Sequence, residues 1–223
     1  MELVANFHLR YAKSAEQVKL VENQPFPHTL PTNGTAYYNQ NGNTTGAGYD
    51  GPGECLRHVF GNGKRLYPST GDVSAWWTRI NNSEFITPNN LAQGYREGAW
   101  LFVPPQCERS HVTAVATRLR RSSLGAAGGC KLIVLPGGCR AYSDDPPNGG
   151  SDDAFARYGM ANGFVVLKPC HGGAIDLGTY PDNHENRRGM VDVYGQLTPL
   201  YATQMGGQME PTGKMIKRLL SSA

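Results

Sequence analysis

The stretch that decides the fold of this chain runs Cys130-Lys131-Leu132-Ile133-Val134-Leu135-Pro136-Gly137-Gly138-Cys139. Its centre is a short, continuous apolar run with β-branched residues, which is typical of a strand buried on both faces of a sheet. A Pro-Gly-Gly turn ends the run abruptly. The stretch therefore predicts a buried strand that leads directly into a tight turn.

A helix and a second strand are predicted directly downstream. Residues 152–162 show helical spacing, and Gly163 is expected to end the helix. The side chains predicted to share one face are Ala154, Phe155, Tyr158 and Ala161. A second apolar run spans 164–167 and is closed by Pro169, which completes a βαβ unit whose crossover is almost always right-handed. Because sites in open α/β sheets lie at the carboxyl ends of strands, we expect a site in the loop 136–140.

Further helices are predicted in other parts of the chain. The helix over 52–60 has Asp50 as its candidate N-cap, and Cys55 within it is expected to be a buried core residue. Its inward-facing side chains are predicted to be Leu56, Val59 and Phe60. Amphipathic patterns predict the other two helices over 2–15 and 212–222. The apolar side chains of the last helix are Met215, Ile216, Leu219 and Leu220.

Apolar runs and their glycine or proline boundaries predict the remaining elements. Short strands are expected over 18–21 and 99–103, with an edge segment between Trp77 and Ile86. Residues 33–51 are rich in glycine and asparagine and are predicted to be loop, whereas 111–121 is predicted to be helical.

The composition suits one globular domain and argues against two classes of partner. The 223 residues are 39% hydrophobic, which is enough for a core, and their formal net charge is +3. The basic cluster of Arg118, Arg120 and Arg121 lacks the interleaved aromatic residues of a nucleic-acid surface, so no nucleic-acid partner is expected. No membrane span is expected either, because no apolar run approaches the roughly 20 residues that cross a bilayer.

The cysteines predict a disulfide rather than a metal site. Five cysteines form no Cys-x-x-Cys pair, and no histidine cluster has ligand spacing, so neither a metal nor a cofactor is expected. Cys107 closes one predicted strand and Cys130 opens the next. A disulfide between them would remove loop entropy worth roughly 3 kcal/mol, and we expect it in preference to two free thiols.

Three glycosylation sequons begin at Asn33, Asn43 and Asn81. Sequons matter only in a secreted chain, and they arise often by chance, so alone they decide little. Residues 1–7 contain an acidic residue, Glu2, where a signal peptide has basic residues, and no apolar segment follows. We therefore do not expect them to form a signal peptide.

Several segments, taken in order, resemble the poly(3-hydroxybutyrate) depolymerase family of α/β-hydrolases. The βαβ unit between Leu132 and Pro169 has the family's layout. The family's Tyr-Ala-Thr-x-x-Gly-x-Gln segment is similar to residues 201–208, and its Tyr-Asp-x-Ala-Gly helix is similar to residues 49–53. Segments 83–85 and 101–107 also have counterparts. The resemblance covers nearly the whole chain, in the order of the family's circularly permuted, extracellular type.

The resemblance implies roles for three residues. His28, which lies between prolines, falls on the family's catalytic histidine; without the resemblance, a surface or packing histidine would be the better interpretation. Gly138 and Cys139 fall on the oxyanion loop, in which the backbone N–H of Cys139 would stabilise the tetrahedral oxyanion. The sulfur of Cys139 would have no part in this chemistry.

The chain also departs from the family. Gly137 replaces a histidine of the oxyanion loop, and Val191 and Val193 flank Asp192 where the family has a tryptophan, which puts polymer recognition in doubt. No Gly-x-Ser-x-Gly nucleophile elbow occurs in the 223 residues. In the permuted family the serine and the triad aspartate both precede the segment that Met1 would match. We therefore expect the C-terminal portion of an esterase, truncated at its N-terminus and inactive alone.

The expected fold is an α/β-hydrolase-like sheet with flanking helices that lacks the nucleophile-bearing strands. Residues 1–223 would form one partial domain, made of a His-bearing segment (1–63), connecting strands (64–107), and the oxyanion strand, βαβ unit and C-terminal helix (130–223). Exposed apolar surface is expected where the absent strands would pack.

Two functions follow from these observations. The first is a serine-type carboxylic ester hydrolase for an ester or polyester substrate, extracellular in its full-length form, without an obligate protein partner. The alternative is a non-catalytic, secreted binding or structural protein on the same scaffold. A nucleotide-binding protein is disfavoured, because Pro-Gly-Gly-Cys after a strand is neither a P-loop nor a Gly-x-Gly-x-x-Gly fingerprint.

Overall fold

The computed structural model describes residues 2–22, 30–32, 37–38, 44–45, 49–61, 65–92, 95–108, 130–136, 146–147, 150–171 and 198–221. These residues belong to two compact units. The first contains Met1–Thr70 and Gly149–Asn162, and the second contains Gly71–Asn148 and Gly163–Ala223. The predicted helix over 111–121 lies outside the described residues.

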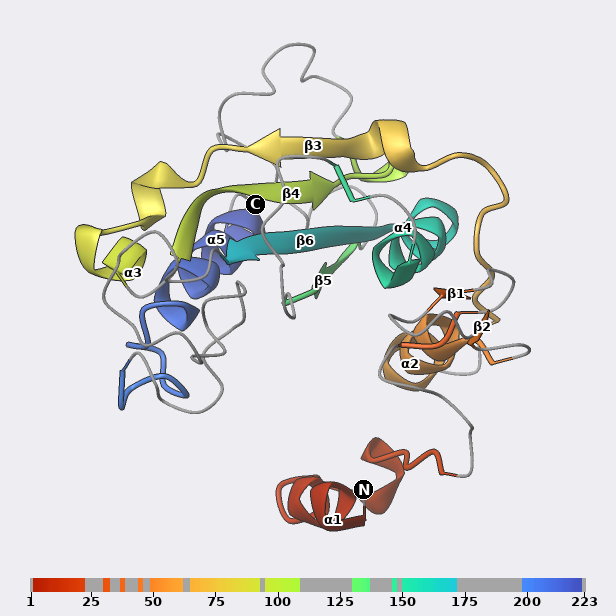
Figure 1. Cartoon of the computed structure of the whole chain (residues 1–223). Coiled ribbons are helices and arrows are strands. Elements are labelled where there is room, and N and C mark those ends of the chain that lie inside the picture. Colours follow the sequence, from red (N-terminus) through yellow and green to blue (C-terminus); the bar gives the residue numbers. More distant parts are fainter. Residues whose placement is uncertain are drawn as a thin grey trace. The chain divides into compact units, whose positions relative to one another are not determined.

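The second unit is built on a mixed sheet of four strands (Figure 1). In sheet order these are β3 (Trp77–Ile80), β4 (Tyr95–Phe102), β6 (Phe164–His171) and β5 (Lys131–Val134). The β5 and β6 strands are parallel, and Ile133 lies opposite Val166. The predicted parallel pair is therefore confirmed, whereas β3–β4 and β4–β6 are antiparallel.

The burial of β5 corrects one prediction. Lys131 is exposed, and the three apolar residues that follow it are only half-buried, so the strand is not buried on both faces. The reason is its place in the sheet, because β6 is its one strand partner among the described residues. The β6 strand also extends past Pro169, its predicted end, to His171. Pro169 lies beyond the residues that pair with β5, and proline is tolerated best at such ladder ends.

The core of the second unit lies between β4, β6 and the helix α5 (Met209–Ser221). Met215 and Leu219 are buried in it and Ile216 is partly buried, as the sequence predicts. Leu220, predicted to be apolar and inward, is 54% exposed because it lies on the other side of the helix. The shorter elements of this unit are α3 (Pro88–Ala92) and the 3-10 turns η2 (Ser74–Trp76), η3 (Ser83–Phe85) and η4 (Pro105–Cys107).

A buried asparagine fixes the start of β4. The strand begins at Tyr95, earlier than predicted, and its register to β6 shifts between Tyr95 and Ala99. Gly98 lies within this bulge with a φ of 89°, a conformation that L side chains rarely adopt. The Asn82 side chain accepts a hydrogen bond from the Gly98 N–H at 2.6 Å and donates one to the Gly98 carbonyl at 3.3 Å. Asn82 thereby provides a side-chain partner for both backbone groups of Gly98.

The predicted disulfide is present. Cys107 and Cys130 are bonded, with their Cα atoms 6.0 Å apart, and the bond joins the end of η4 to the residue before β5. The left-handed Gly163, with a φ of 73°, lies beside both sulfurs. Among the described cysteines, Cys55 and Cys170 are not part of a disulfide. Cys170 is buried in β6, but Cys55 is exposed, against its predicted place in the core.

In its described residues, the first unit contains three helices and a short pair of antiparallel strands. The helices are α1 (Glu2–Leu9), α2 (Gly51–Phe60) and α4 (Gly150–Asn162), with a 3-10 turn, η1, at Ala15–Gln17. The antiparallel strands β1 (Tyr37–Tyr38) and β2 (Thr44–Thr45) lie in a segment that is predicted to be loop. Neither the long helix over 2–15 nor a strand over 18–21 forms. The α1 helix ends at Leu9 and buries no residue, so no packed face supports a longer helix.

The α2 and α4 helices form where they are predicted, but with different inward faces. Asp50 caps α2, and Leu56 is buried, whereas Val59 is 57% exposed and Phe60 is half-buried. In α4 the buried residues are Phe155, Ala156, Tyr158 and Gly159. Ala154 is half-buried and Ala161 is exposed. In the described part of the chain, no helix is long and apolar enough to cross a bilayer.

Candidate functional site

Five of the eight predicted site residues lie outside the described residues. They are His28, Asn33, Asn43, Gly138 and Cys139. Cys107 and Cys130 form the disulfide, and the third sequon asparagine, Asn81, is exposed at the end of β3. The roles of the catalytic candidates therefore stay predictions. The structure describes residues 30–32, which follow His28, and residues 130–136, which precede the oxyanion loop.

The strand before the predicted oxyanion loop is well defined. The β5 strand ends at Val134, and the next N–H, that of Leu135, donates to the Leu167 carbonyl at 2.9 Å. Pro136 follows and is exposed. The sheet therefore supports the chain up to Leu135, three residues before Gly138.

The chain after His28 is anchored to the start of α2. The Pro31 carbonyl accepts a hydrogen bond from the Gly51 N–H at 3.0 Å, and Thr32 is buried. Only glycine fits at this contact, because a Cβ on Gly51 would lie 2.8 Å from the Pro31 carbonyl oxygen. Three residues downstream of His28, the backbone is thus held against a helix N-terminus.

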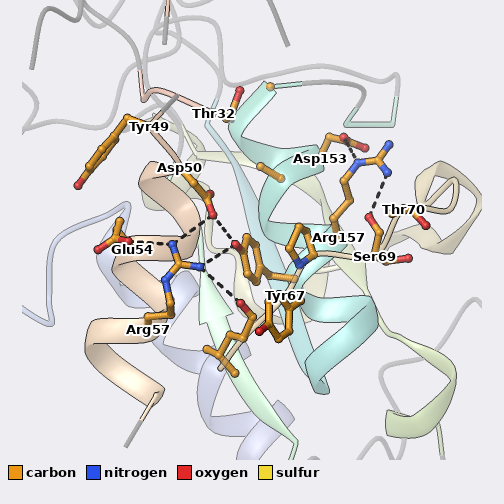
Figure 2. A pocket seen from close by; sticks show the side chains of 15 residues that line it. Thr32, Tyr49, Asp50, Glu54, Arg57, Tyr67, Ser69, Thr70, Asp153 and Arg157 are labelled. Carbon is orange, nitrogen blue, oxygen red and sulfur yellow. Dashed lines mark hydrogen bonds and ion pairs between the residues drawn. The ribbon is translucent and has the colours of Figure 1, made fainter. Parts of the chain in front are cut away.

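A cavity of about 730 Å³ opens in the first unit (Figure 2). Its walls come from α2, from α4 and from the extended segment 65–70, and Thr32 contributes to its rim. The polar and charged side chains that line it are Thr32, Tyr49, Asp50, Glu54, Arg57, Tyr67, Ser69, Thr70, Asp153, Arg157 and Tyr158. The lining thus combines charged side chains with aromatic faces, and one of its residues, Thr32, is four positions after the predicted catalytic histidine in the sequence.

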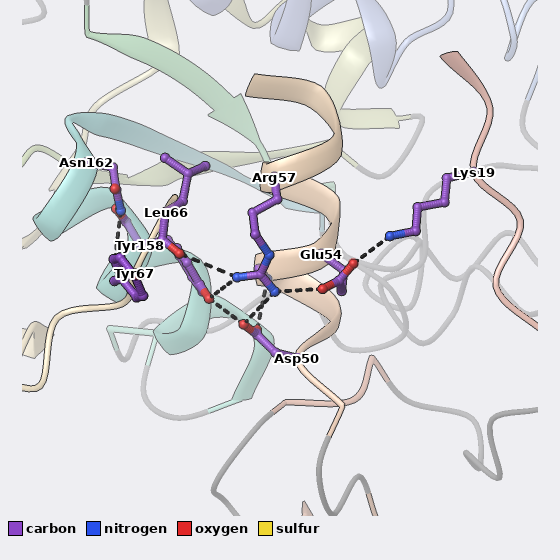
Figure 3. Close-up of polar contacts among 9 residues, drawn as sticks. Lys19, Asp50, Glu54, Arg57, Leu66, Tyr67, Tyr158 and Asn162 are labelled. Atoms are coloured by element: carbon purple, nitrogen blue, oxygen red, sulfur yellow. Dashed lines mark hydrogen bonds and ion pairs between the residues drawn. The ribbon is translucent and has the colours of Figure 1, made fainter. Parts of the chain in front are cut away.

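Arg57 is the centre of a hydrogen-bond network on one wall of this cavity (Figure 3). Its Nη2 donates to Glu54 at 2.9 Å and to Asp50 at 3.3 Å. Its Nη1 donates to the Tyr158 hydroxyl at 3.0 Å and to the Leu66 carbonyl at 3.4 Å. One guanidinium therefore links α2, α4 and the extended segment between them in the sequence.

Asp50 is held by three donors. Its Oδ1 accepts from the Gly53 N–H at 2.9 Å, which caps α2, and its Oδ2 accepts from Arg57 and from the Tyr158 hydroxyl. Burial, and then the hydrogen bond to Asp50, raise the pKa of Tyr158 to about 12. The Tyr158 hydroxyl therefore stays protonated near neutral pH and continues to donate.

The charges of the network are paired with one another. Lys19 Nζ lies 2.5 Å from Glu54, and its hydrogen bond, followed by that of Arg57, lowers the pKa of the Glu54 carboxyl. Burial alone would lower the pKa of Arg57, but its hydrogen bonds with Glu54 and Tyr158 raise it. On the opposite wall, Arg157 binds Asp153 at 2.7 Å. The lining holds three carboxylates and two guanidinium groups, and Lys19, which lies outside the lining, supplies the third positive charge. With its charges paired in this way, the cavity suits an uncharged ligand better than an ion.

The sequence alone did not identify Arg57 and Tyr158 as partners. Asp50 is predicted as the cap, and Tyr158 lies on the predicted inner face of its helix, but the two helices are about a hundred residues apart. The available signal is the spacing of Asp50, Glu54 and Arg57, which places all three on neighbouring turns of one helix. Groups of three or more metal-ligating side chains are absent from the described residues.

Replacing Gly53 with alanine is expected to destabilise the protein, although alanine is the better helix former. A Cβ at this position would collide with the Asp50 carboxylate and the Tyr158 hydroxyl. We expect a loss of about 1–3 kcal/mol in the free energy of unfolding, measured by urea denaturation. The control is Gly213→Ala in α5, where a Cβ meets nothing within 4 Å and a gain of up to about 1 kcal/mol is expected. Equal gains for both variants would contradict the prediction.

Comparison with known proteins identifies the fold. No protein-family model matches the chain, and no curated protein matches it by sequence. Two solved structures match it with high probability: a serine-to-alanine variant of PHB depolymerase complexed with an R3HB trimer, and PHB depolymerase from Penicillium funiculosum. The TM-scores are 0.57 and 0.56, each at 18% identity over 87% of this chain. The fold is similar to that of PHB depolymerases.

The likeness covers only part of those enzymes. The chain spans 57% of the length of each matched depolymerase. The mixed four-stranded sheet with flanking helices is consistent with an incomplete α/β fold, as the sequence predicts. At this identity the likeness concerns the fold alone.

Proposed function

We propose that this chain is part of a serine-type carboxylic ester hydrolase that acts on a polyester of 3-hydroxy acids. The observation that carries the proposal is the shared fold over 87% of the chain with two PHB depolymerases, one of which is complexed with an R3HB trimer. The pairing of the charged side chains in the cavity beside Thr32 supports an uncharged substrate such as an ester.

In this proposal the catalytic groups of the chain are His28 and the backbone around Cys139. His28 accepts the proton of the attacking serine and returns it to the leaving alcohol. The Cys139 N–H donates to the oxyanion, and Gly138 leaves room for the substrate to approach. Two features support this assignment: β5 supports the chain up to the oxyanion loop, and Pro31 anchors the chain after His28.

The nucleophile would come from polypeptide outside these residues. The 223 residues contain no Gly-x-Ser-x-Gly, so on their own we expect them to be inactive, as an N-terminally truncated esterase would be. Loss of a triad residue reduces the rate by about 10⁴–10⁶. The disulfide and the sequons support an extracellular location for the complete protein.

A second candidate is a secreted, non-catalytic binding or structural protein. The observations that favour it are Gly137 in the predicted oxyanion loop, where the resembling family has a histidine, and the valines on either side of Asp192. Such a protein would keep the sheet and the cavity while losing the chemistry.

The coding sequence upstream of Met1 and an ester-hydrolysis assay together test the proposal. If the upstream sequence encodes a Gly-x-Ser-x-Gly, the extended polypeptide is expected to hydrolyse R3HB oligomers and a chromogenic ester, and a serine-directed inhibitor should stop it. The 223 residues alone should show no inhibitor-sensitive turnover. An upstream sequence without a nucleophile, or an extended polypeptide without activity, would overturn the hydrolase proposal and support the non-catalytic one.

Two substitutions at Cys139 test the oxyanion role. In the extended polypeptide, Cys139→Pro removes the backbone N–H and is expected to reduce kcat about 10²–10³-fold, the usual effect of losing one oxyanion donor. Cys139→Ala keeps the N–H and should retain kcat within a few-fold. A large loss in the alanine variant would instead assign the function to the thiol.

A further inference from the structure

The third sequon lies at a sharply defined position in the sheet. Asn81 follows Ile80, the last residue of β3, and its side chain is exposed. The next residue, Asn82, is 0% exposed and holds the Gly98 backbone, and Ser83 is exposed again. Two adjacent asparagines therefore have opposite environments, and of the two the sequon makes only Asn81 the acceptor.

The local turn orients the Asn81 amide. Its Oδ1 accepts a hydrogen bond from the Ser83 N–H at 2.9 Å. Because a carboxamide has its oxygen and nitrogen on opposite branches, this bond directs Nδ2, the atom to which an N-linked sugar is attached, away from the turn. In the part of the chain that the structure describes, Asn81 makes no other hydrogen bond, so attachment there breaks none.

We propose that Asn81 carries an N-linked glycan and that this glycan shields the edge of β3. This inference rests on the part of the proposed function that makes the protein secreted, because sequons are used only in secreted chains. It does not depend on the proposed ester hydrolysis. The β3 strand is the first strand in the sheet order, so among the residues that the structure describes no strand pairs with its second edge (Figure 1). An open edge is a template for pairing with another chain, and a bulky, hydrated sugar at its end opposes such pairing.

The glycan would also leave the core undisturbed. In β3, Trp77 and Ile80 are buried, while Thr78 and Arg79 are exposed. A glycan on Asn81 would lie on exposed surface just after the end of the strand. On Asn82 it would have to displace the two bonds to Gly98, so the neighbouring asparagine cannot substitute for it.

The test is expression of the full 223-residue chain behind a heterologous signal peptide in a eukaryotic secretory host. Asn33→Gln and Asn43→Gln are included in every variant, so that only the Asn81 sequon remains. Ser83→Ala destroys this sequon without altering Asn81, and Ser83→Thr preserves it. Enzymatic release of the glycan converts Asn81 to aspartate, which peptide mass spectrometry detects at this residue.

The parent chain and Ser83→Thr are expected to show a mobility shift that glycan release removes, and Ser83→Ala is expected to show none. Unmodified Asn81 in the secreted parent chain would overturn the assignment, whatever the esterase assay gives. In sedimentation velocity, Ser83→Ala should self-associate at concentrations at which Ser83→Thr stays monomeric. Equal association of the two would overturn the shielding role.

Discussion

Replacing His28 with alanine in the nucleophile-containing polypeptide is expected to reduce kcat/KM for a chromogenic ester by about 10⁴-fold or more. A serine hydroxyl is a weak nucleophile unless a base removes its proton, and triad residues act as a unit. Once the base is lost, the oxyanion donors and substrate binding still provide some catalysis. Activity should therefore fall steeply without vanishing, while KM changes little.

A second histidine provides the control. His58 is exposed on α2, and its Nε2 lies 3.1 Å from the Gln17 carbonyl. His58→Ala should retain kcat/KM within a few-fold, because the contact of this ring with the described residues is an exposed one. If both variants lost activity equally, the loss would be a folding effect. If neither did, His28 would not be the base.

Replacing Asn82 with alanine is expected to lower the free energy of unfolding by about 3 kcal/mol. The substitution leaves the N–H and the carbonyl of Gly98 without their partner inside the bulge, and each unsatisfied buried group costs about 1–3 kcal/mol. For a chain of this size the midpoint of thermal unfolding should fall by roughly 6–12 °C. Denaturant and thermal unfolding of the chain, produced without glycan, measure both quantities.

The neighbouring asparagine is the matched control for this prediction. Asn81→Ala removes one exposed hydrogen bond, so we expect a change of about 0.5 kcal/mol or less. The two variants have the same chemistry at adjacent positions and differ in burial. Similar losses for both would mean that Asn82 does not support the bulge.

How far the sequence predicts the fold depends on whether each signal is local. The apolar runs at 131–134 and 164–167 are local, and both strands and their parallel pairing are confirmed. The boundaries of α2 are also encoded locally, by Asp50 at the start and Gly61 at the end. The early start of β4 could not be predicted, because it depends on Asn82, sixteen residues away.

The inner faces of the helices were less predictable for the same reason. Val59 and Cys55 are apolar or nearly so, yet the orientation of α2 is set by Arg57, which binds Tyr158 a hundred residues downstream. The spacing of apolar residues within one helix gives no information about a hydrogen-bond partner so far away in the sequence. The candidate site shows the same limit. The structure describes the elements that support it, whereas His28 and Cys139 are assigned by resemblance and stay predictions.

The bond between Cys107 and Cys130 has a consequence for the covalent integrity of the chain. The two cysteines are 23 positions apart in the sequence and close a ring of polypeptide. A protease that cuts any one peptide bond within this ring leaves a single molecule, because β4 and β5 stay connected through sulfur. Separating the fragments would need a reductant as well as a protease. Outside the cell, where reductants are scarce, one cut in the ring is thus not enough to divide the protein.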